Sequence, residues 1–367
     1  MSHEINNDQA VLLLEDGYLF KGSSFGKKGT VVGRLSYNAG MTGYQEVITD
    51  PSNKGQLLVM SVSHVGNYGV NEKDVESKDI QIKGLISKKI ANKFSRMTSK
   101  VSMKEYLEEQ EVVAIENIDT RALIGHLRSS GSMKGVISSE GHSIEELKAL
   151  LAEYTEEEYQ KDVKYQAEAP YFYGIESSPL RVAVIDYGLK KGILDSLAKR
   201  DVYLKVFNEN ATLEDIKAFE AQGVVLSNGP GNPSKMPEKL ALINEIKDSG
   251  LPVFAIGLGF QLLSISYDVP TYTLDLASKG PNHPVINLKT NLCEITAQNH
   301  TYGISSESLK NHSELEVTHK NLNDDTMVGF QHKTEPIFGV VYHPESKPGT
   351  HDSQYLFDNF VEIIKKN

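Results

Sequence analysis

The chain has 367 residues, of which 39% are hydrophobic and 24% charged, a composition typical of a soluble protein long enough for two domains, or three. Lys plus Arg number 38 and Asp plus Glu 49, so the formal net charge is −11, which argues against nucleic acid as the main partner because phosphate neutralisation needs a basic surface. The single cysteine, Cys293, excludes an internal disulfide and a cysteine-rich metal site, and it limits thiol catalysis to one position.

No run of apolar residues is long enough to span a membrane, and the polar N-terminus lacks the features of an export signal. We therefore expect a cytoplasmic protein with no membrane partner.

The first 140 residues predict mainly strands and turns. Apolar runs at 10–14 and 18–20 flank Glu-Asp-Gly and indicate a β-hairpin. Further expected elements are a strand at 56–61 and short helices at 104–109 and 120–127, the second capped by Asp119 or Thr120.

Residues 140–168 are strongly acidic, with nine Asp or Glu against three lysines. Apolar residues at helical spacing over 144–151 predict an amphipathic helix, and Pro170 with Ser177-Ser178-Pro179 indicates a solvated interdomain connection. We therefore divide the chain into a domain at 1–150, an acidic helix and linker at 151–179, and a second domain at 180–367.

The second domain alternates short apolar runs with helical stretches, which predicts an α/β fold around a mainly parallel sheet. Ligands bind such folds at the carboxyl ends of the strands. The expected strands are 181–186, 203–207, 223–227 and 252–256, separated by helices at 189–199, 213–220 and 237–248.

Two of these strand ends carry glycine-rich sequences. The strand at 223–227 runs into a loop in which Gly229 and Gly231 allow backbone N–H groups to approach a ligand oxygen, although the same pattern also fits a simple tight turn. The strand at 253–256 turns at Gly257 into a helix, as in a nucleophile elbow, where the helix N-terminus can stabilise an oxyanion. Glycine at this turn supplies no nucleophile.

Another apolar run, at 337–341, is followed by Tyr342-His-Pro-Glu-Ser346. In an extended segment the His-x-Glu spacing places both side chains on one face, so that Glu345 could orient His343 as a general base, or the two could form a purely structural pair. The remaining histidines lack metal-ligand spacing, so we expect no metal site. The segment 22–27 departs from the Walker spacing, so we expect no nucleotide site in this chain.

Together, Asn228-Gly-Pro-Gly-Asn-Pro233, the Gly-Leu-Gly-Phe-Gln elbow and His343-Pro-Glu345 resemble a class I glutamine amidotransferase domain. Upstream, four segments resemble the N-terminal mixed β/α domain of the small-subunit family of carbamoyl phosphate synthetase: Met41-Thr-Gly-Tyr-Gln-Glu46, Thr49-Asp-Pro51, His64-Val-Gly-Asn-Tyr-Gly69 and Ile118-Asp-Thr-Arg121. The resemblance covers almost the whole chain.

The resemblance implies a subunit that releases ammonia from glutamine through a cysteine thioester and passes it to a large synthetase subunit. ATP and Mg are expected only on that large subunit, so this chain needs no cofactor of its own. The expected product is carbamoyl phosphate for arginine or pyrimidine synthesis.

The resemblance also implies roles for individual residues. Position 257 corresponds to the nucleophile, His343 to the base and Glu345 to its orienting acid. Residues implied in the oxyanion hole or glutamine pocket are Gly40, Lys190, Gly229, Gly231, Leu258, Gln261, Asn299, Thr301 and Tyr302.

This chain departs from the family pattern at the places that matter most for catalysis. The family elbow reads Gly-Ile-Cys-Leu-Gly-His-Gln, whereas here Gly257 replaces the cysteine and Phe260 the histidine. Gly40 stands where the family has a serine, and Thr301-Tyr302 where it has Gly-Phe; the family's Phe-Gly-His is replaced around 276–278. Cys293 lies outside the elbow, and we expect it to be a small buried residue.

Three hypotheses follow from these departures. The first is a small subunit that has lost glutaminase activity and serves an ammonia-dependent large subunit. The second is a working glutaminase whose cysteine was replaced by engineering or error. The third is a non-catalytic protein that binds a partner or senses glutamine.

Overall fold

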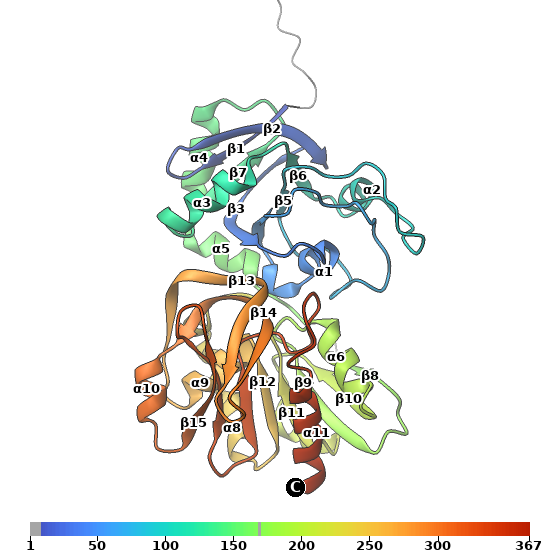
Figure 1. Ribbon diagram of the computed structural model, residues 1–367, viewed down its shortest axis with the longest axis vertical. Helices are drawn as coiled ribbons and strands as arrows, with labels where there is room; N and C mark the ends of the chain where they lie inside the picture. Colours follow the sequence, from blue (N-terminus) through green and yellow to red (C-terminus); the bar gives the residue numbers. More distant parts are fainter. Residues whose placement is uncertain (1–8, 168–169) are drawn as a thin grey trace, which may run out of the picture. The chain divides into compact units, whose positions relative to one another are not determined.

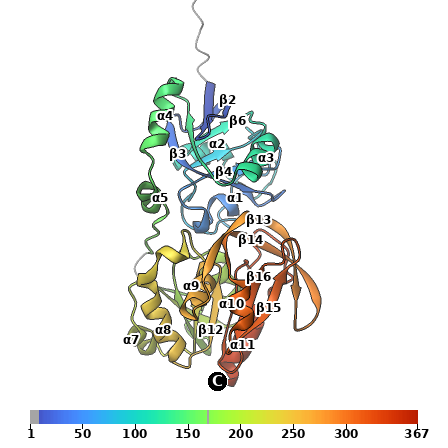
Figure 2. The ribbon, with the colours of Figure 1, turned by 90° about the vertical axis from the view of Figure 1, so that its left-hand side faces the viewer.

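The computed structural model describes residues 9–167 and 170–367, and the chain divides into two compact units, Met1–Lys164 and Tyr165–Asn367. Figures 1 and 2 show the elements of each unit.

The first unit is built around a closed β-barrel with the strand order β1-β2-β6-β5-β4-β3-β7. Pairing of β1 with β2 confirms the hairpin expected from the sequence, and parallel pairing joins β3 to β4, β4 to β5 and β5 to β6. The strands are β1 (Gln9–Leu14), β2 (Leu19–Gly26), β3 (Thr30–Asn38), β4 (Gln56–Met60), β5 (Gly84–Ile86), β6 (Val113–Glu116) and β7 (Lys134–Ser138).

Side-chain caps start most helices of this unit. The carboxylate of Asp119 accepts a hydrogen bond from the Ala122 N–H, which confirms one of the two expected caps, and Ser143 forms a capping box with Glu146. The helices are α1 (Tyr44–Ile48), α2 (Met103–Glu109), α3 (Thr120–Ser130), α4 (Ile144–Glu153) and α5 (Glu156–Val163).

Helix α5 lies within the acidic helix and linker expected at 151–179, although the sequence predicted helical periodicity only over 144–151. Thr155 caps it, and the first turn carries Glu156, Glu157 and Glu158. Acidic side chains at a helix N-terminus interact favourably with the helix dipole, so the charges that suggested a solvated linker also favour this helix.

The second unit contains, among its described residues, a ten-stranded sheet with the order β14-β13-β15-β16-β17-β12-β11-β9-β10-β8. The strands from β17 to β10 run parallel, as the α/β pattern predicted, and antiparallel strands extend the sheet on both sides. These strands are β8 (Tyr171–Tyr173), β9 (Leu180–Ile185), β10 (Val202–Phe207), β11 (Gly223–Leu226), β12 (Val253–Ile256), β13 (Thr271–Asn287), β14 (Leu292–Ile304), β15 (Leu315–Asn321), β16 (Met327–His332) and β17 (Ile337–Val340).

The parallel strands are buried on both faces, so their side chains form the main core. Phe357 and Phe360 of the C-terminal helix pack against Phe254 of β12. The helices are α6 (Lys191–Ala198), α7 (Leu213–Ala218), α8 (Leu240–Asp248), α9 (Leu258–Ser266), α10 (Ser306–Asn311) and α11 (Tyr355–Lys366).

The expectation that Cys293 is buried is wrong. The residue lies near the start of β14, the edge strand of the sheet, and its side chain is exposed as a free thiol. An edge strand has a neighbour on one side only, so an apolar run there need not be covered by other elements.

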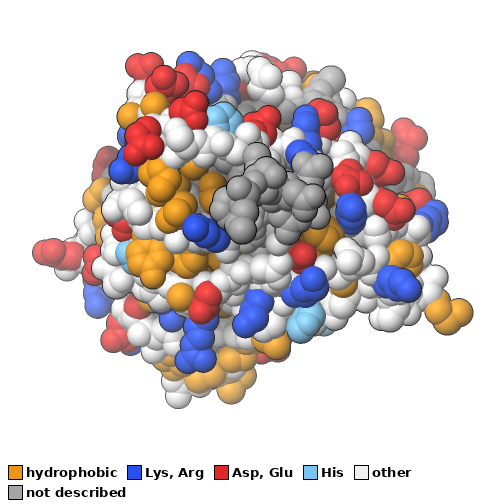
Figure 3. Space-filling model, turned by 90° about the horizontal axis from the view of Figure 1, so that it is seen from above, with side chains coloured by type: hydrophobic (Ala, Val, Ile, Leu, Met, Phe, Trp, Pro, Cys, Tyr) orange, Lys and Arg blue, Asp and Glu red, His pale blue; other side chains and the backbone are white. Residues whose placement is uncertain are grey.

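The surface carries charges of both signs. On the face drawn in Figure 3, acidic and basic side chains are interspersed with apolar ones. None of the helices in the described part of the chain is both long and apolar enough to cross a membrane.

Candidate functional site

The elbow, by which we mean Gly257 between β12 and α9, has the sharp backbone turn that the sequence predicted. Its φ is 58° and its ψ −116°, a conformation that strains any residue with a Cβ. The Gly257 N–H donates to the Val340 carbonyl at 3.0 Å. A Cβ added at this position would lie 3.0 Å from the Asn228 Cβ, so a side chain here needs a shift of a few tenths of an ångström.

His343 and Glu345 are brought together, but not by the extended segment that we expected. Strand β17 ends at Val340, and His343 forms an isolated bridge in which its N–H donates to the Ala297 carbonyl of β14 at 2.8 Å. A turn at Pro344 and Glu345 then places the Glu345 Oε1 3.1 Å from the His343 Nδ1. The pairing was predicted correctly, whereas the backbone that produces it was not.

Lys190 completes a buried row of ionisable groups. Its Nζ lies 2.7 Å from the Glu345 Oε1, and the exposed fractions of the two side chains are 3% and 0%. Burial alone raises the pKa of Glu345, but the charges of Lys190 and His343 outweigh this effect and hold the pKa well below its usual range. The carboxylate therefore stays ionised at neutral pH and can orient the His343 ring.

The glycine-rich loop after β11 packs against the loop that carries Lys190. A Cβ at Gly229 would lie 2.1 Å from the Tyr187 carbonyl oxygen, so this position requires glycine for close backbone approach. Gly231 has a φ of 103°, in the region that favours glycine. These contacts give both glycines a structural reason, beside the role in an oxyanion hole that the resemblance implies.

Asn228 was not singled out from the sequence, although it begins the glycine-rich motif. Its Nδ2 donates to the Gly188 carbonyl at 2.8 Å, and its Oδ1 accepts from the Lys190 N–H at 3.1 Å. The side chain thereby ties the glycine-rich loop to the backbone of Lys190, while its Cβ faces the elbow.

The expected glutamine-pocket residues lie on α9 and β14. The Gln261 Nε2 donates to the Tyr302 carbonyl at 2.7 Å, and the Asn299 Oδ1 accepts from the Lys279 Nζ at 2.7 Å. Leu258 is the first residue of α9 and is buried, whereas Thr301 and Tyr302 are half-buried. Since the Ala297 carbonyl accepts from the His343 N–H, β14 connects the expected base with the expected pocket.

His300 is a buried neighbour of this site that the sequence did not single out for a role. Burial, together with the charges of Lys279, His283 and His343, lowers the pKa of His300 to about 3. Its ring is therefore neutral at physiological pH.

Two further substituted positions have local contacts within their own units. The Phe260 ring is fully buried, with its centroid 4.9 Å from that of Phe330, so it belongs to the core beneath α9. Gly40 belongs to the first unit, where its N–H donates to the Asn38 Oδ1 at 2.7 Å.

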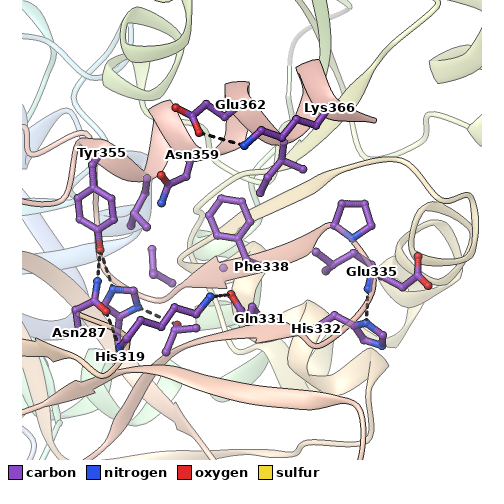
Figure 4. Close-up of a pocket in the computed structure, with 18 residues that line it drawn as sticks. Asn287, His319, Gln331, His332, Glu335, Phe338, Tyr355, Asn359, Glu362 and Lys366 are labelled. Carbon is purple, nitrogen blue, oxygen red and sulfur yellow. Dashed lines mark hydrogen bonds and ion pairs between the residues drawn. The ribbon is translucent and has the colours of Figure 1, made fainter. Parts of the chain in front are cut away.

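A cavity of about 260 Å³ lies elsewhere in the second unit, between α11 and the strands β15 to β17 (Figure 4). Its lining includes none of the predicted site residues. The polar groups at its floor are bonded to one another: the Tyr355 hydroxyl lies 3.0 Å from the His319 Nε2 and accepts from the Asn287 Nδ2 at 2.8 Å. We therefore do not assign the site to this cavity.

Within residues 9–167 and 170–367, no three His, Cys, Asp or Glu side chains are arranged to hold a metal ion.

Comparison with known families identifies the class of each unit. Residues 183–363 match the family model described as glutamine amidotransferase class-I. This matched range contains the elbow, the glycine-rich loop and the His343–Glu345 pair. Residues 12–137 match the carbamoyl-phosphate synthase small chain, CPSase domain. The second unit is therefore a class I glutamine amidotransferase domain, preceded by a domain of the synthase small chain.

The carbamoyl phosphate synthase small chain of Aquifex aeolicus is 42% identical over 97% of this chain and 99% of its own length. The pyrimidine-specific small chain of Bacillus subtilis is 39% identical over 96% of this chain and 95% of its own. A crystal structure of a glutamine amidotransferase from Thermotoga maritima aligns with 51% of this chain and with 85% of its own chain. The sequence identity is 15% and the TM-score is 0.38. The chain belongs to the carbamoyl phosphate synthase small-chain family.

Proposed function

We propose that this chain is the small subunit of a carbamoyl phosphate synthase in which glutamine hydrolysis is lost or severely impaired. The observation that carries the proposal is the glycine at position 257, at the sharp backbone turn of the elbow. The chain would assemble with a large synthetase subunit, which binds ATP and Mg and makes carbamoyl phosphate from ammonia.

Position 257 carries no nucleophile. Without a thiol at position 257 no glutamyl thioester can form, and His343 has no proton to accept from that position. Removing the nucleophile of a triad hydrolase lowers turnover by a factor on the order of 10⁶. Cys293 cannot replace it, because it is exposed at the start of β14 and lies outside the elbow.

The fold does not need the missing thiol. Glycine adopts the elbow conformation without the strain that a Cβ would add, and the Lys190–Glu345–His343 row is retained. A small subunit of this kind can still act as a structural partner that encloses the path of ammonia.

The second hypothesis is an engineered or erroneous loss of cysteine from a working glutaminase. It explains the glycine at position 257 but not the other differences from the family pattern. Phe260 packs against Phe330 in the core, and Gly40 and Thr301-Tyr302 also differ from the family pattern. Several differences from the family pattern favour a natural change over a single engineered one. The sequence of the natural gene at codon 257 decides between the two.

The third hypothesis, glutamine binding without hydrolysis, is supported by the retained Gln261 and Asn299 on the two elements that form the expected pocket. Calorimetric titration with glutamine, with and without the large subunit, tests this hypothesis. Absence of heat in both titrations would contradict glutamine sensing.

The main proposal is tested with the purified complex of this chain and its large subunit. We expect carbamoyl phosphate synthesis with ammonium and none above background with glutamine as the nitrogen source. Glutamine-dependent synthesis at a rate comparable to the ammonium-dependent rate would refute the proposal.

A further inference from the structure

The loop 343–348, which we call the triad loop, is held by a second ion pair besides that of Lys190 and Glu345. The Lys347 Nζ lies 2.7 Å from the Asp195 Oδ2. Asp195 is on α6, the helix that begins directly after Lys190. The pair therefore joins the triad loop to the same segment that supplies the partner of Glu345.

Lys347 is fixed at both its backbone and its side chain. Its carbonyl accepts a hydrogen bond from the Lys190 Nζ at 2.5 Å, while its ammonium group contacts Asp195. Because Lys347 follows Glu345 by two residues, these contacts restrict where the Glu345 carboxylate can lie. His343 in turn is restricted by Glu345 on one side and by β14 on the other.

Asp195 gathers further donors around its carboxylate. The Lys191 Nζ lies 3.0 Å from the Asp195 Oδ2, and the Tyr173 hydroxyl of β8 donates to the Asp195 Oδ1. Burial alone raises the pKa of Asp195, but the contacts with Lys347, Tyr173 and Lys191 lower it to about 2. Asp195 is thus ionised at neutral pH, and so it can hold Lys347 there.

The backbone between Glu345 and Lys347 needs such restraint. Ser346 has a φ of 60°, a left-handed conformation that costs energy for a residue other than glycine. Such conformations persist where the surroundings determine them, and they are frequent at functional sites. Here the contacts of Glu345 on one side and of Lys347 on the other restrain Ser346.

We infer that Asp195 and Lys347 are positioning residues that hold His343 against position 257 through the triad loop. The inference rests on the proposed assignment of His343 and Glu345 as triad partners. Neither residue touches the reacting atoms; they act by fixing the Lys347 backbone and, through it, Glu345.

The experiment uses the full-length chain with Gly257→Cys and Cys293→Ser, so that the introduced thiol is the only one. A thiol held beside a protonated imidazole forms a thiolate at low pH and reacts rapidly with iodoacetamide. Alkylation rates are measured at about pH 6, where this pairing matters, and at about pH 9, where an ordinary thiol is already largely ionised. The assay requires no glutamine turnover.

In this background we expect Lys347→Ala and Asp195→Ala each to slow alkylation at the lower pH by about tenfold and to change the rate at the higher pH by less than about twofold, since only the thiolate fraction changes. The double variant should be no slower than either single one, because both residues act through one contact. Lys347→Arg should restore the rate. Lys191→Ala is the matched control: it removes a donor from the same carboxylate but none from the triad loop, and it should leave the rate unchanged.

Unchanged alkylation in Lys347→Ala at the lower pH, or additive losses in the double variant, would overturn the inference. If the parent thiol itself reacted no faster than a free thiol at that pH, His343 would not be held against position 257, and the inference would fail together with the triad assignment. The dependence of the complex on ammonium or glutamine is measured separately and does not depend on either result.

Discussion

At the scale of single residues, glycine suits position 257 for two reasons. Its φ of 58° is strained for other residues, and the Asn228 Cβ stands 3.0 Å from where its own Cβ would be. In this chain the turn is therefore free of the strain that a nucleophile would have to bear.

The strain at the elbow can be measured with Gly257→Ala. We expect it to lower the free energy of unfolding by about 1–3 kcal/mol, because alanine adds both an unfavourable φ and a tight contact with Asn228. Denaturant unfolding measures the loss. Gly250→Ala is the control, since Gly250 also has a positive φ, of 76°, but no atom within 4 Å of an added Cβ. Equal losses in the two variants would show that the Asn228 contact contributes nothing.

The Lys190–Glu345 pair is the second feature that belongs to this scale. Lys190→Met should lower the free energy of unfolding by about 3–5 kcal/mol at neutral pH, because it leaves a buried carboxylate without its partner. The folded-state pKa of Glu345 lies below its usual value of 4.5, so this stabilisation is present above that value and is lost as the pH falls below it. Unfolding followed from neutral to acid pH should therefore show the parent and the variant converging below about pH 4.5. A difference that stayed constant across that range would contradict the assignment.

Restoring the family's histidine at position 260 should destabilise the fold. Phe260→His should lower the free energy of unfolding by about 2–4 kcal/mol, because it places a polar ring in the space packed against Phe330 and removes apolar contact there. Thermal unfolding measures the effect. Stability equal to that of the parent would show that this part of the core has polar partners for an imidazole.

At the scale of elements, the sequence predicted those strands and helices whose own residues determine them. The strands of the parallel sheet are continuous apolar runs, and the turn at Gly257 follows from a glycine at the end of one of them. The bounds of helix α5 were not predicted and strand β8 was missed, because each owes its structure to contacts with other elements. β8, for example, is three residues long and is defined by its pairing with β10.

Helix α5 is fixed to the barrel by side chains that are distant in the sequence. Arg34 of β3 pairs with Glu156 and stacks over the Tyr159 ring, and the Lys83 Nζ lies 2.6 Å from the Asp162 Oδ2. The periodicity of residues 156–163 contains none of this information. For the same reason, the sequence suggested an extended segment at His343, where pairing with Ala297 and a turn are found instead.

This dependence makes a prediction for α5. Arg34→Ala should lower the free energy of unfolding by about 1 kcal/mol, since the ion pair is partly exposed, and it should speed amide exchange in residues 156–163. Hydrogen exchange read by mass spectrometry measures both α5 and β4, and β4 serves as the internal control. Unchanged exchange in α5 would show that the helix is stable without its contacts to the barrel.

At the scale of the whole molecule, the motifs indicated the family and the order of its two domains before any contact was known, and the matches at 12–137 and 183–363 confirm that family. The motifs also named most members of the candidate site. What they could not supply were the supporting roles of Asn228, Asp195 and Lys347, which arise from contacts between segments far apart in the sequence.

The proposed loss of glutamine hydrolysis depends above all on the side chain missing at position 257, since the Lys190–Glu345–His343 row is retained. Comparing glutamate release from glutamine by the chain as it stands and by Gly257→Cys, each in complex with the large subunit, tests this claim most directly. We predict no release above background before the change and a rise of several orders of magnitude after it. Equal rates of glutamate release before and after the change would contradict the account.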